Sequence, residues 1–448
     1  MENLSVISRN PSVIYIGAEN IDEDRIDGEF YNYKYLENEI KLKKSGIKIK
    51  VLNDVIERMN SPIGWQGIPS SSYLPHGLGV PLIRVQNVSD LILDEESLIG
   101  VEESIYDEQP AIQAQPNDII ITRVGTIGRV CRIPEKINRI AMGQNLTRIK
   151  LNETLVESGF MLAYMSSKFC QIQMERYAYG GVQASLTNKN IKQLLVPIPS
   201  PEIQKYIGDK VRKAEGLREE AKRLKKEAEE IFNQNYEQIR KNNSKFEWVN
   251  SYYLNEDNII PNFYKQYELL KDKKHAYIEF ENIIESIKCG IPVRSDMRIG
   301  DIYPFYGASG VTDNIGDYNF DGEYLIVAQD GSIGLVNVAR NKFWANNHVW
   351  VVQVKEGWDL EFLELYLNKY NYWISLTTGS VVPKVTSENL KRLLVPKIDY
   401  EIQRSIGDKI REAKYKDENS KMLIEQAKND VEDLIEGNFD MSKVKANN

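Results

Sequence analysis

Hydrophobic residues follow the same pattern twice along this chain. The apolar run Leu194–Val196 ends at Pro197, and after it apolar residues recur every three or four positions. The run predicts a short buried strand, because proline cannot donate to a ladder, and the later spacing predicts a long helix. Pro197 and Gly208 recur as Pro396 and Gly407, 199 residues further on and with no gap. This repetition predicts a chain built from two like halves.

The two long helices are predicted to pair with each other. Small and leucine residues stand at heptad spacing on the first helix, and small residues stand at equivalent positions on the second. These residues are Ala214, Leu217, Ala221, Leu224 and Ala228 on the first helix, and Ala413, Ser420 and Ala427 on the second. The second helix has a weaker leucine pattern, because Lys416 and Asp430 replace Leu217 and Ile231. An amphipathic helix that packs only on its own domain is the alternative. The two matched seams favour mutual pairing.

Upstream of each long helix, the pattern predicts a mixed α/β globule. Strand patterns cover 81–88, 118–124, 129–133 and 145–151 in the first half, and 302–311, 323–338 and 348–354 in the second. Helical patterns cover 155–174 and 360–375, and the polar stretch 233–247 predicts a linker. The predicted fold class is α+β, with two tandem domains each followed by a long helix. The predicted boundaries are 1–200 and 241–399 for the domains, 201–240 for the central helix and linker, and 400–438 for the C-terminal helix.

Composition narrows the class of protein further. The chain has 448 residues, of which 42% are apolar and 27% are charged, and this is typical of a globular protein of two or three domains. No apolar window reaches the length of a membrane span and the N-terminus lacks the pattern of a leader, so we expect a cytoplasmic protein without a membrane partner. The net charge of −8 argues against indiscriminate coating of nucleic acid.

Catalytic and metal-binding patterns are absent from the sequence. The three cysteines lie far apart, and the three histidines form no metalloprotease signature. The sequence also lacks a nucleoside-triphosphate loop and a dinucleotide-binding fingerprint. We therefore expect no catalytic residue, no metal site and no cofactor on this chain.

Base-reading chemistry is enriched in matched loops of the two halves. The turn at 123–129 matches the turn at 329–334, with Gly125 and Gly128 equivalent to Gly331 and Gly334, and Gln144 and Asn145 match the polar stretch 346–348. Arginine can read guanine bidentately, and asparagine or glutamine can read adenine. The alternative is that these are hairpin turns capped by their own amides.

The candidate DNA-binding residues lie in these loops and in the segments beside them. In the first half they are Arg84, Gln86, Asn87, Arg123, Thr126, Arg129, Gln144, Asn145 and Gly180. In the second half they are Tyr306, Ser309, Gln329, Ser332, Asn346, Asn347, His348 and Lys384.

The repeated stretches LLVPIPSPEIQKYIGDKV and LLVPKIDYEIQRSIGDKI, with the segment GDYNFDGEYLIVAQDGSIG, carry a resemblance to a known family. Over nearly its whole length the chain resembles the specificity subunit of type I restriction-modification systems. The resemblance implies two target-recognition domains, each reading one half of a bipartite, asymmetric double-stranded DNA target, and two helices that pair as an antiparallel coiled coil.

The resemblance also implies a division of labour between subunits. The specificity subunit is not an enzyme, and it recruits two modification subunits that bind S-adenosylmethionine and methylate adenine, together with restriction subunits that hydrolyse ATP and cleave DNA. Two alternatives stay open at this point: a self-contained DNA methyltransferase or nuclease that carries recognition modules, and a coiled-coil scaffold without a nucleic-acid ligand. Assays of methyl transfer, cleavage and DNA binding by the chain, with and without a partner, separate the three.

Overall fold

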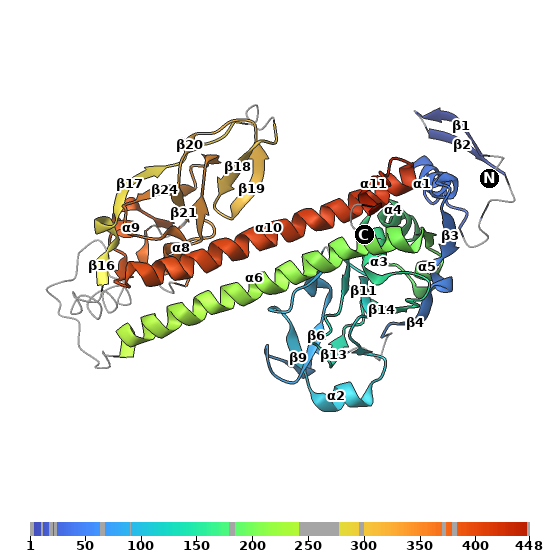
Figure 1. The fold of residues 1–448 in the computed structure, drawn as a ribbon, viewed down its shortest axis with the longest axis horizontal. Coiled ribbons are helices and arrows are strands. Elements are labelled where there is room, and N and C mark those ends of the chain that lie inside the picture. The colour runs from blue at the N-terminus through green and yellow to red at the C-terminus, as the bar shows by residue number, and fades with distance from the viewer. Residues whose placement is uncertain are drawn as a thin grey trace. The chain divides into compact units, whose positions relative to one another are not determined.

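The structure is a computed structural model that describes residues 4–9, 12–17, 21, 25–62, 68–89, 91–178, 184–241, 277–294, 300–369, 373–378 and 383–445. It divides into two compact units (Figure 1). Unit 1 comprises the described parts of 1–218 and 418–448, and unit 2 those of 219–417. Each long helix is therefore shared between the units, whereas the predicted boundaries assigned each helix to a segment of its own.

A four-stranded antiparallel sheet forms the centre of unit 1, in the order β12-β11-β14-β4. Its strands are β4 (Ile56–Asn60), β11 (Ile119–Thr122), β12 (Val130–Arg132) and β14 (Leu146–Leu151). All four residues of β11 are buried, because Ile119 and Ile121 face one hydrophobic core and Ile120 faces another. A strand covered on both faces shows no alternation of polar and apolar residues, so its sequence is a continuous apolar run.

The second sheet of unit 1 has five strands in the order β10-β13-β6-β9-β5. They are β5 (Tyr73–Leu74), β6 (Val80–Ile83), β9 (Ile99–Val101), β10 (Gln113–Ala114) and β13 (Ile140–Met142). β6 and β13 run parallel. Outside these sheets, β1 (Leu4–Arg9) pairs with β2 (Ser12–Ile16) and β7 (Val88–Ser89) pairs with β8 (Ile92–Leu93). Two 3-10 turns lie at Ser70–Ser72 and Val85–Asn87.

The helices of unit 1 other than α6 and α10 are short. They are α1 (Tyr33–Lys44), α2 (Glu103–Glu108), α3 (Ser158–Ser166), α4 (Lys168–Tyr177), α5 (Asn188–Lys192) and α11 (Ser442–Lys445). The single helix predicted over 155–174 is two helices, because Ser167 is extended and its hydroxyl donates to the carbonyl of Tyr164 at 2.7 Å. A 3-10 turn (Leu52–Asp54) connects β3 (Lys48–Val51) to β4. β3 pairs with β15 (Leu195–Ile198).

Unit 2 repeats this plan. Its first sheet has the order β22-β21-β24-β17 and its second the order β19-β18-β23-β20, in which β18 and β23 run parallel. The first-sheet strands are β17 (Ile284–Cys289), β21 (Tyr324–Ala328), β22 (Val336–Ala339) and β24 (Val349–Val354). Those of the second sheet are β18 (Tyr303–Gly307), β19 (Gly310–Ile315), β20 (Phe320–Asp321) and β23 (Lys342–Ala345).

Most of the remaining elements of unit 2 also have counterparts among the described elements of unit 1. β16 (Tyr277–Glu279) pairs with β27 (Leu394–Pro396), and β25 (Thr377–Thr378) pairs with β26 (Lys384–Val385). Its short helices are α8 (Leu360–Asn368) and α9 (Ser387–Lys391), and its 3-10 turns are Phe280–Asn282 and Trp373–Leu376. The predicted strand 323–338 is a hairpin, with the turn that contains Gly331 and Gly334 between β21 and β22.

The long helices are α6 (Pro201–Lys241) and α10 (Tyr400–Glu436), and they pair in each unit. In unit 1, Val211 and Ala214 of α6 share a core with Ile424 and Ala427 of α10. The predicted linker 233–247 is wrong for its first part, because α6 continues to Lys241. Residues 242–247 lie outside the described residues.

In unit 2, Ala221 and Leu224 of α6 pack with Ala413 of α10, and Ala228 shares a core with Ile406 and Ile410. Lys416 pairs with Glu220 at 3.1 Å and Lys409 with Glu227 at 2.6 Å, so seven residues forward on α6 match seven residues backward on α10. The pairing is therefore antiparallel, as predicted. In unit 1, Ser420 is also buried, and Leu217 is half-buried.

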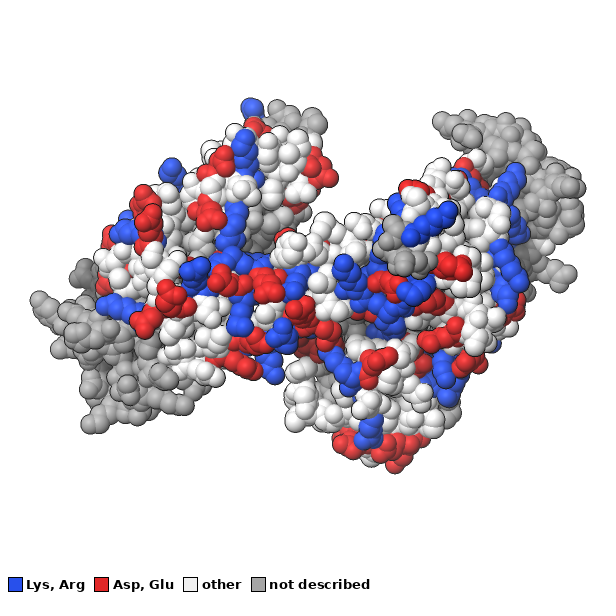
Figure 2. Space-filling view, in the orientation of Figure 1, with Lys and Arg blue, Asp and Glu red and all other residues white. Residues whose placement is uncertain are grey.

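Charged residues are distributed unevenly over these elements. Lysine and arginine alternate with aspartate and glutamate along α6 and α10, whereas acidic residues gather over α2, where Glu103, Asp107 and Glu108 lie (Figure 2). Among the described helices, none is both long enough and apolar enough to cross a bilayer.

Candidate nucleic-acid interface

The hairpin turn after the buried strand has the same backbone geometry in both units. In unit 1, the N–H of Gly128 donates to the carbonyl of Thr122 at 3.0 Å, and in unit 2 the N–H of Gly334 donates to that of Ala328 at 3.2 Å. Both glycines have positive φ, +83° and +81°. A residue with a Cβ strains this region of backbone, and a Cβ on Gly128 or Gly334 would also crowd Gln171 or Trp373, so glycine fits the turn.

A second loop lies beside each turn through matched hydrogen bonds. The backbone N–H of Arg123 donates to the carbonyl of Asn145 at 2.9 Å, and that of Gln329 donates to the carbonyl of His348 at 3.1 Å. The side chains repeat the relationship. Arg123 Nη2 donates to the Gln144 carbonyl at 3.0 Å, and Gln329 Nε2 donates to the Asn347 carbonyl at 2.5 Å.

A third segment completes the arrangement. The carbonyl of Arg123 accepts from the N–H of Leu186 at 2.9 Å, and the carbonyl of Gln329 accepts from that of Val385 at 2.8 Å. In each unit the turn, the second loop and this segment thus converge on one residue. We call this set of bonds the reading framework, and it makes Gln144 equivalent to Asn347 and Asn145 equivalent to His348.

The parallel strands place a fourth segment next to the reading framework. The N–H of Gly143 donates to the carbonyl of Ile83, and that of Asn346 donates to the carbonyl of Tyr306, both at 2.9 Å. The segment that begins at Arg84 in unit 1, and the one that begins after Tyr306 in unit 2, therefore start beside the second loop. Local sequence alone does not show this contact, because the paired strands lie far apart along the chain.

Most candidate residues of unit 1 are accessible. Gln86, Thr126, Arg129 and Gln144 are exposed, and Arg84, Arg123 and Asn145 are half-buried. Burial lowers the pKa of the Arg123 guanidinium. Asn87 is the exception, because it is fully buried, accepts from the Arg84 N–H at 2.8 Å and donates to Ser97 Oγ at 2.7 Å. Its side chain holds a turn together, so its assignment as a DNA-contacting residue is corrected. Gly180 lies outside the described residues.

The candidates of unit 2 divide in the same way. Ser309, Ser332, His348 and Lys384 are exposed, and Asn346 and Asn347 are half-buried. Tyr306 and Gln329 are buried at 8% and 7% exposure. The Tyr306 ring stands edge-on to Phe343 in a hydrophobic core, and the Gln329 amide is bonded to the second loop. For these two residues, direct base reading is corrected to a structural role behind the surface.

The sequence reasoning missed Asp330, the residue after Gln329. Its carboxylate is 2.8 Å from His348 Nδ1 and 3.1 Å from Lys384 Nζ. Burial opposes ionisation of this carboxyl, but the hydrogen bonds from His348 and Lys384 outweigh it and lower the pKa of Asp330. The equivalent residue of unit 1 is Val124, so a comparison of the two halves for shared chemistry did not reveal it.

In each unit, the repeated motif of the long helix bonds to the residue that caps a short helix of the same unit. We call this set of contacts the lock. In unit 1, Gln204 Oε1 accepts from the Glu157 N–H at 2.9 Å, and Glu157 caps α3 by accepting from the Phe160 N–H at 2.7 Å. Arg212 pairs with both Glu157 and Asp209. The Glu157 carboxylate thereby joins α3 to α6.

The same lock occurs in unit 2. Gln403 Oε1 accepts from the Asp359 N–H at 3.2 Å, and Asp359 caps α8 through the Phe362 N–H at 3.0 Å. Arg411 pairs with Asp359 at 2.8 Å and with Asp408 at 2.7 Å. Burial raises the pKa of the Asp359 carboxyl, although the Phe362 N–H and Arg411 oppose the change.

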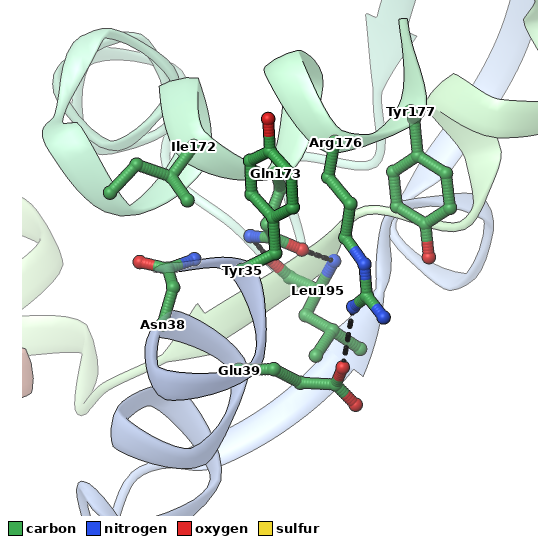
Figure 3. A pocket seen from close by; sticks show the side chains of 8 residues that line it. All are labelled: Tyr35, Asn38, Glu39, Ile172, Gln173, Arg176, Tyr177 and Leu195. Atoms are coloured by element: carbon green, nitrogen blue, oxygen red, sulfur yellow. Dashed lines mark hydrogen bonds and ion pairs between the residues drawn. The ribbon is translucent and has the colours of Figure 1, made fainter. Parts of the chain in front are cut away.

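A small cavity between α1 and α4 of unit 1 does not add a second site (Figure 3). Arg176 in its wall pairs with Glu39 at 2.7 Å and donates to the Phe30 carbonyl at 2.9 Å. Gln173 accepts from the Leu195 N–H at 2.8 Å. Arg176 and Glu39 thus join α4 to α1, and Gln173 joins α4 to β15, so these groups serve the packing of unit 1. Within the described ranges, no group of three or more histidine, cysteine, aspartate or glutamate side chains could hold a metal ion.

Comparison with known proteins gives matches in both halves. Residues 68–230 and 273–429 match the model of the type I restriction modification DNA specificity domain. The chain is 36% identical over 132 residues to a type I restriction enzyme specificity subunit of Haemophilus influenzae, over 29% of this chain and 34% of that protein. It is 30% identical over 139 residues to the EcoBI specificity subunit of Escherichia coli, over 31% of this chain and 28% of that one. The chain thus spans about a third of the length of these curated relatives.

A solved structure of a type I restriction-modification S subunit from M. genitalium aligns with 88% of this chain and 97% of its own, at 14% identity and a TM-score of 0.48. The family model, by contrast, matches more than half of the chain and does so once in each half. The chain therefore belongs to the family of type I restriction modification DNA specificity domains.

Proposed function

We propose that this chain is the DNA-reading subunit of a type I restriction-modification complex, and that its two units read the two halves of a bipartite, asymmetric target. The observation that carries the proposal is the reading framework, which has the same backbone bonds in both units and different side chains on them. Unit 1 presents Thr126, Arg129 and Gln144 where unit 2 presents Ser332, Leu335 and Asn347. Equal backbones favour equal roles, and unequal side chains favour different base sequences.

The chain acts without catalysis in this proposal. Two modification subunits bind S-adenosylmethionine and methylate adenine, and restriction subunits hydrolyse ATP and cleave DNA. Equivalent charged positions at the start of both long helices support docking of two identical partners. Lys205 and Asp209 of α6 correspond to Arg404 and Asp408 of α10, with side-chain exposures of 68% and 43% against 60% and 60%. Because its substrate is cellular DNA, we place the complex in the cytoplasm.

Methylome sequencing of cells that express this chain with its modification subunit tests the proposal and yields the target. A single methylated sequence with two specified halves around an unspecified spacer is expected. Methylation that does not change when this chain is exchanged for a related one would overturn it.

Affinity measurements test the role of the partner. The net charge of −8 leaves little general attraction to phosphates, so the chain alone should bind a target duplex weakly. Fluorescence anisotropy should show a strong gain when modification subunit is added. Equal affinity with and without it would contradict the docking part of the proposal.

A further inference from the structure

Three positions at the reading framework have ionisable side chains in unit 2 and uncharged side chains in unit 1. Asp330, His348 and Lys384 of unit 2 correspond to Val124, Asn145 and Ser185. Where Asp330 and Lys384 form an ion pair at 3.1 Å, Val124 and Ser185 form an isolated β-bridge. The difference is therefore one of chemistry on an equal backbone.

The carboxylate of Asp330 orients the His348 ring. Nδ1 lies 2.8 Å from Oδ1 and 3.0 Å from Oδ2, so the carboxylate accepts the Nδ1 proton and Nε2 is the ring nitrogen left for a ligand. The side chain of Asp330 is 9% exposed, whereas that of His348 is 46% exposed. A buried anion thus holds an accessible imidazole, which is how carboxylates fix the tautomer of functional histidines.

The charge of this cluster depends on one proton. With a neutral ring, Asp330 and Lys384 cancel, and the Nε2 atom can only accept a hydrogen bond. With a protonated ring, the cluster has a net charge of +1 and Nε2 donates. Among the described residues, the thiol of Cys289 at the end of β17 is a further ionisable group beside this loop, and its Sγ lies 3.6 Å from the Asn347 carbonyl. DNA is a polyanion rich in acceptors, such as guanine N7 and O6 and the phosphate oxygens, so it favours the protonated ring.

We infer that His348 binds DNA as an imidazolium, with its Nε2–H donated to an acceptor atom of the half-site that unit 2 reads, and that recognition of this half-site alone strengthens as pH falls. This inference rests on the proposed function. Imidazole is the side chain whose charge ordinarily changes between about pH 5 and 8. The amide of Asn145 at the equivalent position of unit 1 has no charge to change, so the other half-site should be read equally at all these pH values.

The experiment measures anisotropy of a labelled target duplex with the complex of this chain and modification subunit, from pH 6 to pH 8. Because one proton is taken up, affinity should rise as pH falls, by at most about tenfold for each pH unit. His348→Asn, which installs the residue type of unit 1, should abolish this slope. His76→Asn is the matched control: it makes the same change at an exposed histidine of unit 1 whose Nδ1 bonds the Leu98 carbonyl at 2.6 Å, and it should keep the slope.

Two further measurements make the result specific. A duplex with the half-site of unit 2 scrambled should lose the slope, and a duplex with the other half-site scrambled should keep it. Calorimetry of the unaltered complex in buffers of different ionisation enthalpy should show proton uptake on binding, and this readout requires no variant to fold.

A slope that survives in His348→Asn, or sequence-specific binding without any slope, would overturn the inference and leave the proposed function intact. The absence of sequence-specific binding at every pH would instead contradict the proposed function itself. Base and phosphate acceptors are separated by single-base changes in the unit 2 half-site. Loss of the slope with one particular base pair indicates a base-edge acceptor, and a slope retained with every base pair indicates a phosphate.

Discussion

A side chain at Gly208 would collide with Glu157, because a Cβ built on Gly208 stands 1.7 Å from the Glu157 Oε2 atom. The equivalent Cβ on Gly407 stands 2.0 Å from Asp359 Oδ1. Both glycines lie inside long helices, where glycine is normally unfavourable. Close approach of a capping carboxylate explains why the repeated motif has glycine at this position in each helix.

Gly208→Ala should therefore destabilise the protein, by about 1 to 3 kcal/mol, because the Glu157 carboxylate must leave its place at the start of α3. Gly216→Ala on the same helix is the matched control. A Cβ on Gly216 meets nothing within 4 Å, so this variant should gain about 0.5 to 1 kcal/mol from helix propensity. Denaturant unfolding followed by circular dichroism measures both, and a stabilised Gly208→Ala would refute the lock.

The lock also shows what the sequence could and could not predict. The repeat, the paired helices, the small-residue seam and the hairpin turns follow from periodicity and glycine spacing, which are local signals. The role of Gln204 and Arg212 does not follow, because their partner Glu157 lies some 50 residues away in the chain. The sequence does not distinguish a polar residue whose side chain points into its own domain from one whose side chain points at a ligand.

Asp430 gives the clearest case of a residue misjudged from sequence. It stands where the first helix has Ile231, which suggested a weakened seam. In the structure it is 3% exposed and pairs with Lys210, and Lys443 Nζ lies 3.1 Å from its other oxygen. The position is thus half-buried in α6 and buried in α10, where the side chain is a member of an ion pair.

Removal of one member of this pair should cost more than removal of both. Asp430→Ala leaves the ammonium of Lys210, whose side chain is 16% exposed, without its partner, and the cost should be about 3 kcal/mol. The double variant Lys210→Met with Asp430→Leu should lie within about 1 kcal/mol of the unaltered protein, since well-packed apolar residues can replace a buried pair. Lys205→Ala, at an exposed pair of the same helix, should change stability by less than about 1 kcal/mol. Equal losses in the single and double variants would show that packing, not the unpaired charge, is at issue.

The glycine turns and polar loops that the sequence matches between the two halves lie together in the reading framework of each unit. The burial of individual side chains there was less predictable. Burial of Asn87 and Gln329 was not predictable, because amides are typical both of base reading and of turns held by distant backbone groups. Asp330 was not predicted, because its role follows only from its contacts with His348 and Lys384. These two residues lie in two other segments of the chain.

The reading framework supplies a matched pair of variants that tests whether the two units read separate half-sites. Gln144 and Asn347 are equivalent, and in both residues the backbone carbonyl, not the side chain, accepts the framework bond from Arg123 or Gln329. Truncation to alanine therefore keeps the framework and removes only the amide. Gln144→Ala should weaken discrimination at positions of the unit 1 half-site by about 1 to 3 kcal/mol, which is the range for one lost base contact, and should leave the other half-site unchanged. Asn347→Ala should do the reverse. Binding of the complex to a panel of duplexes with single base changes in each half-site measures both effects, and each variant is the control for the other. If either variant relaxed the two half-sites equally, a model of two independent readers would have to be given up.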